Sequence, residues 1–149
     1  MDIIYHCYGG THSSVLAAAL HTGVISHRRP PEGDRLINLP FLDTQDGGNH
    51  GRLYFFGKDE HGNKVYILGR RRDVEALTLV LNGALNEAQR VLLVNALPCV
   101  PLLLKLGGYI SRRLKLARVG RPLVCAGLRR AYPCLHELVY RVKLETCEA

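Results

Sequence analysis

Apolar residues along the first half of the chain alternate between short continuous runs and helically spaced positions. Residues 2–7 form an apolar run typical of a strand, and the Ala-rich stretch 15–22 that follows predicts a helix. Two further runs, 52–56 and 64–68, flank a polar turn and predict a β-hairpin. Helical spacing of Val and Leu then predicts a helix over 73–85.

The second half of the chain has the order strand, helix, strand, helix. The pattern predicts strands over 91–94 and 122–126, and helices over 101–116 and 128–143, with Gly127 as a turn. Three βα units and a hairpin predict one α/β domain over all 149 residues. We expect a three-layer sandwich with a mostly parallel sheet and an inserted β-hairpin.

Two stretches depart from these regular patterns. Residues 26–51 are polar and rich in Gly and Pro, and they are too many for an ordinary connection, so we expect a mobile loop or lid. The pair Gly107–Gly108 interrupts a predicted helix, where glycine is unfavourable. Either another backbone packs closely against this pair, or the helix breaks there.

The junction between the first strand and the first helix predicts an anion site. A glycine turn before a helix directs unpaired backbone N–H groups and the positive end of the helix dipole at one point. The same field would stabilise a thiolate at the end of the strand, and hydroxyl groups add further donors. The candidates are Cys7 as a nucleophile and Gly9, Gly10, Thr11, His12, Ser13 and Ser14 as anion ligands.

Ligands of parallel sheets gather where the strands end, so we expect three loops at one rim. The loop after the second βα strand would contribute Asn95 and Cys99, and the loop after the third would contribute Arg129 and Arg130. Two cations at a helix start oppose the dipole, which favours an anionic partner. The alternative is that Arg130 is solvated or pairs with Glu137.

The charge distribution indicates a second kind of partner. The net charge is +7, and residues 101–149 hold ten Lys/Arg against three Asp/Glu, whereas residues 1–100 hold ten of each. Nucleic acid, an anionic membrane face or an acidic protein would suit this excess, and so would a solvated basic face without a partner. RNA is the weaker choice because the basic segment lacks interleaved aromatics for base stacking.

The number of cysteines and the N-terminal sequence indicate in which cellular compartment the protein is located. Five cysteines is an odd number and no signal peptide is recognisable, so we expect free thiols and a cytoplasmic protein. The longest apolar run, 91–104, is too short for a membrane span. A metal site from Cys7, Cys99, His6 and His12 would lack short-range ligand pairs, so we expect neither a metal nor another cofactor.

The loop of residues 7–14 resembles two families that handle phosphate. Its spacing is similar to the IIB components of bacterial sugar phosphotransferase systems, and the resemblance implies that Cys7 accepts a phosphoryl group. It also looks like the Cys-x5-Arg-Ser loop of low-molecular-weight tyrosine phosphatases, with Ser13 in the place of the arginine. Phosphatase activity would therefore need the charge of Arg129 or Arg130.

Over its full length the chain resembles a family of uncharacterised small bacterial proteins of the Firmicutes type. The blocks 4–14, 95–100, 120–124 and 130–133 carry this likeness. It implies only that these blocks belong to one fold.

The sequence thus predicts an α/β protein that binds a phosphate-bearing small molecule at residues 7–14, with Cys7 as the candidate for phosphoryl transfer. The alternative is a non-catalytic interaction protein that uses residues 101–149 to bind RNA or an acidic protein. Whether the chain is an enzyme stays open at this point.

Overall fold

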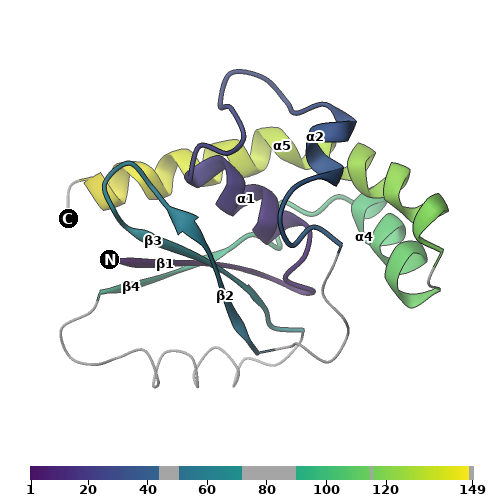
Figure 1. The fold of residues 1–149 in the computed structure, drawn as a ribbon, viewed down its shortest axis with the longest axis horizontal. Helices are drawn as coiled ribbons and strands as arrows, with labels where there is room; N and C mark the ends of the chain where they lie inside the picture. Colours follow the sequence, from purple (N-terminus) through teal and green to yellow (C-terminus); the bar gives the residue numbers. More distant parts are fainter. Residues whose placement is uncertain (44–50, 72–89, 115, 148–149) are drawn as a thin grey trace.

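The computed structural model describes the chain except for residues 44–50, 72–89, 115 and 148–149 (Figure 1). The helix predicted over 73–85 lies outside the described residues. The elements, in chain order, are β1 (Asp2–Cys7), α1 (Ser13–His21), α2 (Gly33–Ile37), β2 (Leu53–Lys58), β3 (Lys64–Gly69), β4 (Val91–Asn95), α4 (Leu102–Gly108), the π-helix η1 (Tyr109–Arg113) and α5 (Ala117–Cys147).

The sheet is built around β1, the first strand of the chain. Its strand order is β2-β3-β1-β4, with β1 parallel to both β3 and β4, and β2 antiparallel to β3. In this register Cys7 lies opposite Gly69, and His6 lies opposite both Leu68 and Asn95. The predicted α/β class, the mostly parallel sheet flanked by helices and the hairpin are confirmed, and the ends of β1, β3 and β4 meet at one edge.

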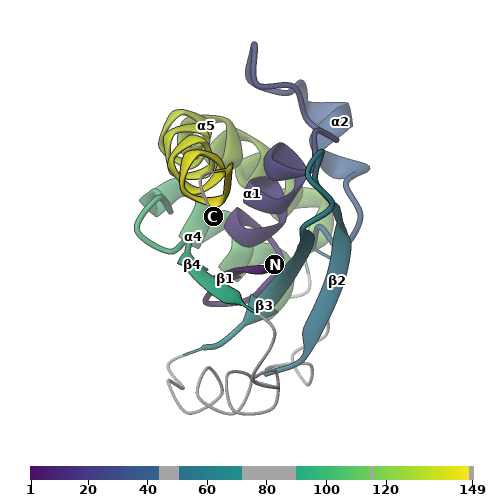
Figure 2. The same cartoon turned by 90° about the vertical axis from the view of Figure 1, so that its left-hand side faces the viewer.

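Helix α1 joins the sheet to the rest of the helical layer. It contacts β1 and β3 on one side and α5 on the other, as Figures 1 and 2 show. All of its residues are buried, and Ala17, Ala18 and Ala19 let the neighbouring elements approach closely. The described helices include none with the length and apolar character that a membrane crossing needs.

A buried hydrogen-bond relay connects β1, α1 and the turn of the hairpin. The hydroxyl of Tyr5 lies 2.7 Å from Nδ1 of His21, and Nε2 of His21 lies 3.1 Å from Oδ2 of Asp59. Asp59 also accepts the backbone N–H groups of His61 and Asn63. A neutral imidazole with its proton on Nε2 satisfies every member of this relay.

The ionisation of the relay follows from its burial. Burial raises the pKa of Tyr5 far above its ordinary range and lowers the pKa of His21. Burial also opposes ionisation of Asp59, but hydrogen bonds from Asn63 and His21 outweigh it and lower the pKa of that carboxyl. The relay therefore holds one carboxylate beside two neutral groups.

The prediction of a third βα unit is wrong. Residues 122–126 and Gly127 lie inside the single helix α5, rather than forming a strand and a turn. The buried apolar positions of α5 recur every three or four residues, at Val124, Leu128, Ala131, Leu135, Val139 and Val142. The sequence pattern predicted a strand here because the short apolar run 123–126 also fits a strand that is buried on both faces.

Close backbone contact explains the glycines of this region. A methyl group on Gly127 would lie 2.6 Å from the Cα of Leu104, and one on Gly107 would lie 2.7 Å from the backbone nitrogen of Val124. The expected close approach at Gly107 is thus confirmed, and the helix predicted over 101–116 also changes at Gly108 into the π-helix η1. Glycine lets α4 and α5 pack backbone against backbone.

The expectation of five free thiols is also wrong. Cys99, after β4, and Cys134, in α5, form a disulfide with a Cα–Cα distance of 5.5 Å. Cys7, Cys125 and Cys147 are free. Because disulfides are rare in cytosolic proteins, the cysteines no longer support the cytoplasmic location, which stays a prediction.

The packing of α4 on α5 predicts that Gly127→Ala destabilises the protein. Alanine favours a helix by about 1 kcal/mol, but the added methyl would force the backbone of Leu104 to move. We expect a net loss of roughly 1–3 kcal/mol in the free energy of unfolding, measured by urea denaturation.

Gly33→Ala in α2 is the matched control, since a methyl group there meets no atom within 4 Å. It should be neutral or slightly stabilising. A Gly127→Ala variant as stable as the Gly33→Ala variant would contradict the packing argument.

Candidate functional site

The sulfur of Cys7 is the centre of the loop between β1 and α1. Its Sγ accepts the backbone N–H of Gly10 at 3.2 Å and lies 3.2 Å from Oγ of Ser14. The loop closes tightly because Gly10 adopts a φ of 70° and lies against the backbone of Gly69, where a Cβ would not fit. The predicted residues Cys7, Gly10 and Ser14 are therefore in direct contact.

The start of α1 offers further donors beside this sulfur. Helix α1 begins at Ser13, and His12 before it provides no side-chain cap. Among the described residues, neither the backbone N–H of Ser13 nor that of Ser14 donates to a protein group, and Oγ of Ser13 is buried without a partner. Unpaired donors at a helix start are the groups that bind anions in other proteins.

A buried carboxylate, Asp43, lies against the same loop. Its oxygens bond to Nε2 of His12 at 3.3 Å and to the hydroxyl of Ser111, and Nε of Arg121 lies 3.7 Å away. Its backbone N–H donates to the carbonyl of Thr11, and its own φ is 54°, in the left-handed region. One side chain thus connects the loop with η1 and α5.

Two arginines follow β3 at the edge where Cys7 lies. The backbone N–H of Arg70 donates to the carbonyl of Cys7, and that of Arg71 donates to the carbonyl of Tyr8. The side chain of Arg70 turns toward the sheet, where its Nε donates to Nδ1 of His6 at 3.2 Å. These two residues bring positive charge to the end of β1.

The histidine beside Arg70 is held neutral. His6 is buried in β1, and burial, together with the charge of Arg70, lowers the pKa of His6 to about 4. Its Nδ1 carries no proton, since it accepts a hydrogen bond from Arg70. His6 therefore anchors Arg70 and is not a cation at neutral pH.

The other residues expected at the rim have different positions. Asn95 ends β4 at the same edge, exposed, with Oδ1 accepting the N–H of Leu97. Cys99 is bonded to Cys134 and is not a free thiol. Arg129 and Arg130 are exposed in the middle of α5 and follow no strand, so the reasoning that placed them at the rim is wrong.

The pairing proposed as an alternative for Arg130 is likewise not found. Glu137 bonds to Nε of Arg141, one turn further along α5, at 2.8 Å. In the ranges that the structure describes, no ion pair joins Arg129 or Arg130 to the loop of Cys7. In the described residues, the backbones of Arg70 and Arg71 contact residues 7 and 8, and Arg121 reaches Asp43 beside the loop.

Sequence reasoning missed Asp43, Arg70, Arg71 and Arg121. A signal was present for the two arginines after β3, because they directly follow a predicted strand. It was not used because a hairpin strand was not expected to lie parallel to β1. Asp43 had no comparable signal, since nothing local relates it to residues 7–14.

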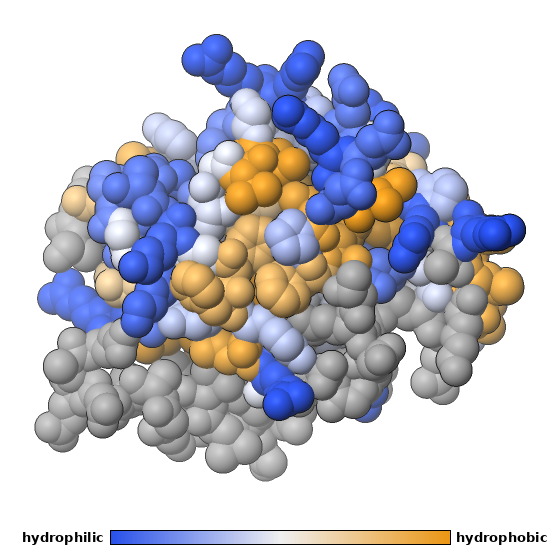
Figure 3. All heavy atoms as spheres, viewed as in Figure 1, coloured by the Kyte–Doolittle hydropathy of each residue, from blue (hydrophilic) through white to orange (hydrophobic). Residues whose placement is uncertain are grey.

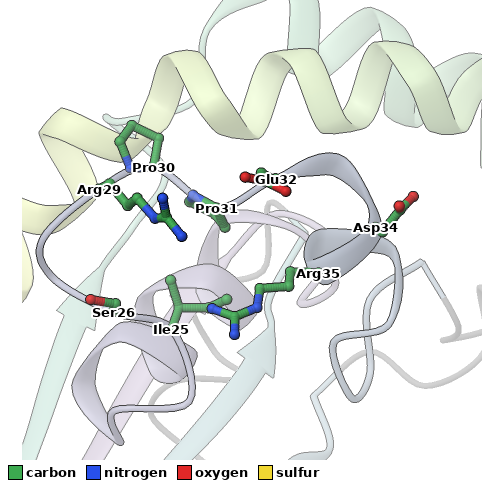
Figure 4. A pocket seen from close by; sticks show the side chains of 8 residues that line it. All are labelled: Ile25, Ser26, Arg29, Pro30, Pro31, Glu32, Asp34 and Arg35. Carbon is green, nitrogen blue, oxygen red and sulfur yellow. The ribbon is translucent and has the colours of Figure 1, made fainter.

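A cavity of about 230 Å³ lies away from this site (Figure 4). Its lining comes from residues 25–35, within the stretch predicted to be a lid, and the guanidinium groups of Arg29 and Arg35 extend into it. It follows the end of α1, whereas Cys7 precedes the start of that helix, so a helix of roughly 13 Å separates the two. Lid motion stays a prediction.

The His, Cys, Asp and Glu side chains of the described part of the chain form no group of three or more that could hold a metal ion. The groups around Cys7 are a thiol, hydroxyl groups, backbone N–H groups and the arginines that follow β3. Such a set suits an oxyanion, and phosphate in particular.

Comparisons with known proteins place the chain in a broader context. A family model described as "Protein of unknown function (DUF3189)" matches residues 2–144. No curated protein and no solved structure matches the chain. The expected likeness to an uncharacterised family over nearly the full length is confirmed, and the bacterial origin stays a prediction.

The low pKa of His6 predicts a loss of stability in mild acid. Between pH 6.5 and about 4 the unfolded chain binds a proton at His6 that the folded chain does not. The contribution is complete above pH 6.5 and is lost as the pH falls, by up to roughly 3 kcal/mol. Urea unfolding measured from pH 4 to 7.5 should show this decline.

Two variants test the origin of this decline. His6→Gln removes the titrating group, so the free energy of unfolding should depend less on pH. Arg70→Gln removes a charge that lowers the pKa of His6 in the folded chain, so the decline should still begin near pH 6.5 but should be smaller and end above pH 4. An unchanged pH dependence in His6→Gln would mean that another group causes it.

Proposed function

The chain belongs to the DUF3189 family, whose description states no function, and from its own residues we propose that the Cys7 loop, residues 7–14, binds a phosphate-bearing small molecule. The observation that carries this proposal is the position of Cys7 Sγ, bonded to Gly10 and Ser14 at the start of α1. A helix start with a glycine entry and unpaired N–H groups is pre-organised for phosphate.

The surroundings of the loop favour an anion. The N–H groups of Ser13 and Ser14 and the hydroxyl of Ser13 provide donors that phosphate oxygens would satisfy. Arg70 and Arg71 add positive charge at the same sheet edge. The carboxylate of Asp43 beside the loop would repel an anion, but the hydrogen bond from Ser111 and the charge of Arg121 offset this repulsion.

We assign Cys7 the role of phosphoryl acceptor. Its thiolate would attack the phosphorus of a phosphate ester, forming an S–P bond while the bond from phosphorus to the ester oxygen breaks. The leaving oxygen takes a proton from water, and the phosphocysteine then passes its phosphoryl group to water or to a second acceptor. The N–H of Gly10 and the hydroxyl of Ser14 would stabilise the thiolate before the attack.

The first experiment uses phosphate to protect Cys7. If phosphate occupies the loop and excludes the reagent, alkylation of Cys7 by iodoacetamide should slow by about fiftyfold at a phosphate concentration about 50 times the dissociation constant. Mass spectrometry of the digested protein measures the rate at each cysteine. Exposed Cys147 is the internal control, since it lies beside His61 rather than at the loop.

Two outcomes of this experiment would count against the proposal. Phosphate could leave the alkylation rate of Cys7 unchanged, or it could slow Cys7 and Cys147 equally. Sodium chloride at matched ionic strength separates site protection from a general salt effect. Ser14→Ala should slow alkylation of Cys7 without phosphate, because the hydroxyl no longer supports the thiolate.

The second experiment tests the donors of the loop through stability. Phosphate should raise the melting temperature more than sodium chloride of equal ionic strength, because a ligand of the folded state stabilises it. Ser13→Ala removes a donor to the anion, so the affinity for phosphate should fall by about one to two powers of ten.

Arg35→Gln controls for the other anion-attracting feature, the cavity of residues 25–35. It should leave the phosphate effect intact if the Cys7 loop is the site. If Arg35→Gln removes the effect while Ser13→Ala keeps it, phosphate binds the cavity and the assignment to Cys7 fails.

A further inference from the structure

One end of the molecule exposes large apolar side chains together with basic ones. Helix α4, η1 and the start of α5 form a helical hairpin at the right-hand end of Figure 1, and Figure 3 shows orange and blue atoms side by side there. We call residues 102–114 and 116–121 the tip. Its large apolar side chains with 50% exposure or more are Leu102, Leu106, Tyr109, Leu114, Leu116 and Val119.

Three of these side chains share one side of α4 and η1, and all six are exposed. In α4 and η1 the exposed positions Leu102, Leu106 and Tyr109 are spaced by four and three residues, so they lie on one side of the helix. Leu104 and Gly107, on the other side, make the contact with α5. Leu102 alone is 80% exposed, which packing within the chain does not explain.

All the charged residues of the tip are basic. Residues 101–136 contain no Asp or Glu but eight Lys/Arg, five of them within the tip. Lys105 and Arg118 are exposed, and in the described part of the chain neither forms an ion pair. Within the tip, Nε of Arg121 lies 3.7 Å from a carboxylate oxygen of Asp43.

We propose that the tip docks on the surface of a membrane that contains anionic lipids. Exposed leucines and valine would enter the boundary between headgroups and acyl chains, while lysine and arginine contact the lipid phosphates. Neither signal alone gives stable attachment, but apolar insertion and a basic patch together do. The tip lies on the membrane and does not span it, because α4 has seven residues.

A membrane fits these side chains better than a nucleic acid does. Nucleic acid also attracts positive charge, but its binding proteins use aromatic groups for stacking, and five of the six exposed apolar residues of the tip are aliphatic. Aliphatic groups gain nothing from a phosphate backbone in water, whereas in lipid they are removed from water.

Sedimentation with lipid vesicles tests this proposal on the full chain. The protein should sediment with vesicles of phosphatidylcholine that contain 30% phosphatidylglycerol, and much less with phosphatidylcholine alone. The double variant Leu102→Ser/Leu106→Ser should weaken binding by about tenfold or more. Lys105→Gln/Arg118→Gln should weaken it similarly and make the remaining binding less sensitive to salt.

Matched controls come from other parts of the surface. Val24→Ser changes an apolar residue that is 55% exposed outside the tip, and Arg28→Gln removes an exposed cation outside it. Both should bind vesicles as the unchanged protein does. All the altered residues are exposed, so circular dichroism should show unaltered helix content and melting.

Several results would overturn the proposal. One is a failure to bind the anionic vesicles, and another is binding that the leucine variant keeps in full. A third is an affinity for a labelled single-stranded RNA, or for polyglutamate, that exceeds the affinity for vesicles and does not depend on Leu102 and Leu106. The last result would assign the tip to RNA or to an acidic protein.

Discussion

The buried relay of Tyr5, His21 and Asp59 fixes the parts of the molecule on which the Cys7 loop depends. It joins the central strand β1 to α1 and to the turn of the hairpin, three segments far apart in the sequence. Loss of one member would leave a buried polar group without a partner, which costs more than the hydrogen bond contributes. The relay thereby fixes the C-terminal end of α1 against the middle of β1 and against the hairpin turn, which sets the direction of the helix that follows the Cys7 loop.

The sequence was sufficient to predict the strands whose apolar runs are bounded by turns or polar residues. The length and apolar content of the runs 2–7, 52–56 and 64–68 placed three strands correctly, and the short run 91–94 placed the fourth. They failed at 122–126, because five residues cannot distinguish a buried strand from a turn and a half of buried helix. The distinction came from Gly127 against Leu104, a contact between residues 23 positions apart.

The site residues that could be predicted are close in the sequence, and those that could not be predicted are joined only by tertiary contacts. Cys7, Gly10 and Ser14 could be proposed together because one short loop contains them. Asp43 and Arg70 reach this loop only through tertiary structure, the first by a left-handed turn and the second by the parallel pairing of β3 with β1. Arg70 directly follows a predicted strand, but the sequence does not indicate that this strand pairs with β1, and nothing near Asp43 in the sequence indicates its contact with the loop.

The disulfide between Cys99 and Cys134 has its main consequence in the unfolded chain. It closes a loop whose ends are 35 residues apart, so α4 and the first half of α5 remain tied to the segment after β4 when the protein unfolds. By the chain-entropy model this restriction contributes about 4 kcal/mol to the free energy of unfolding. This part of the stability thus arises because the disulfide lowers the conformational entropy of the unfolded chain, and not from a contact in the folded protein.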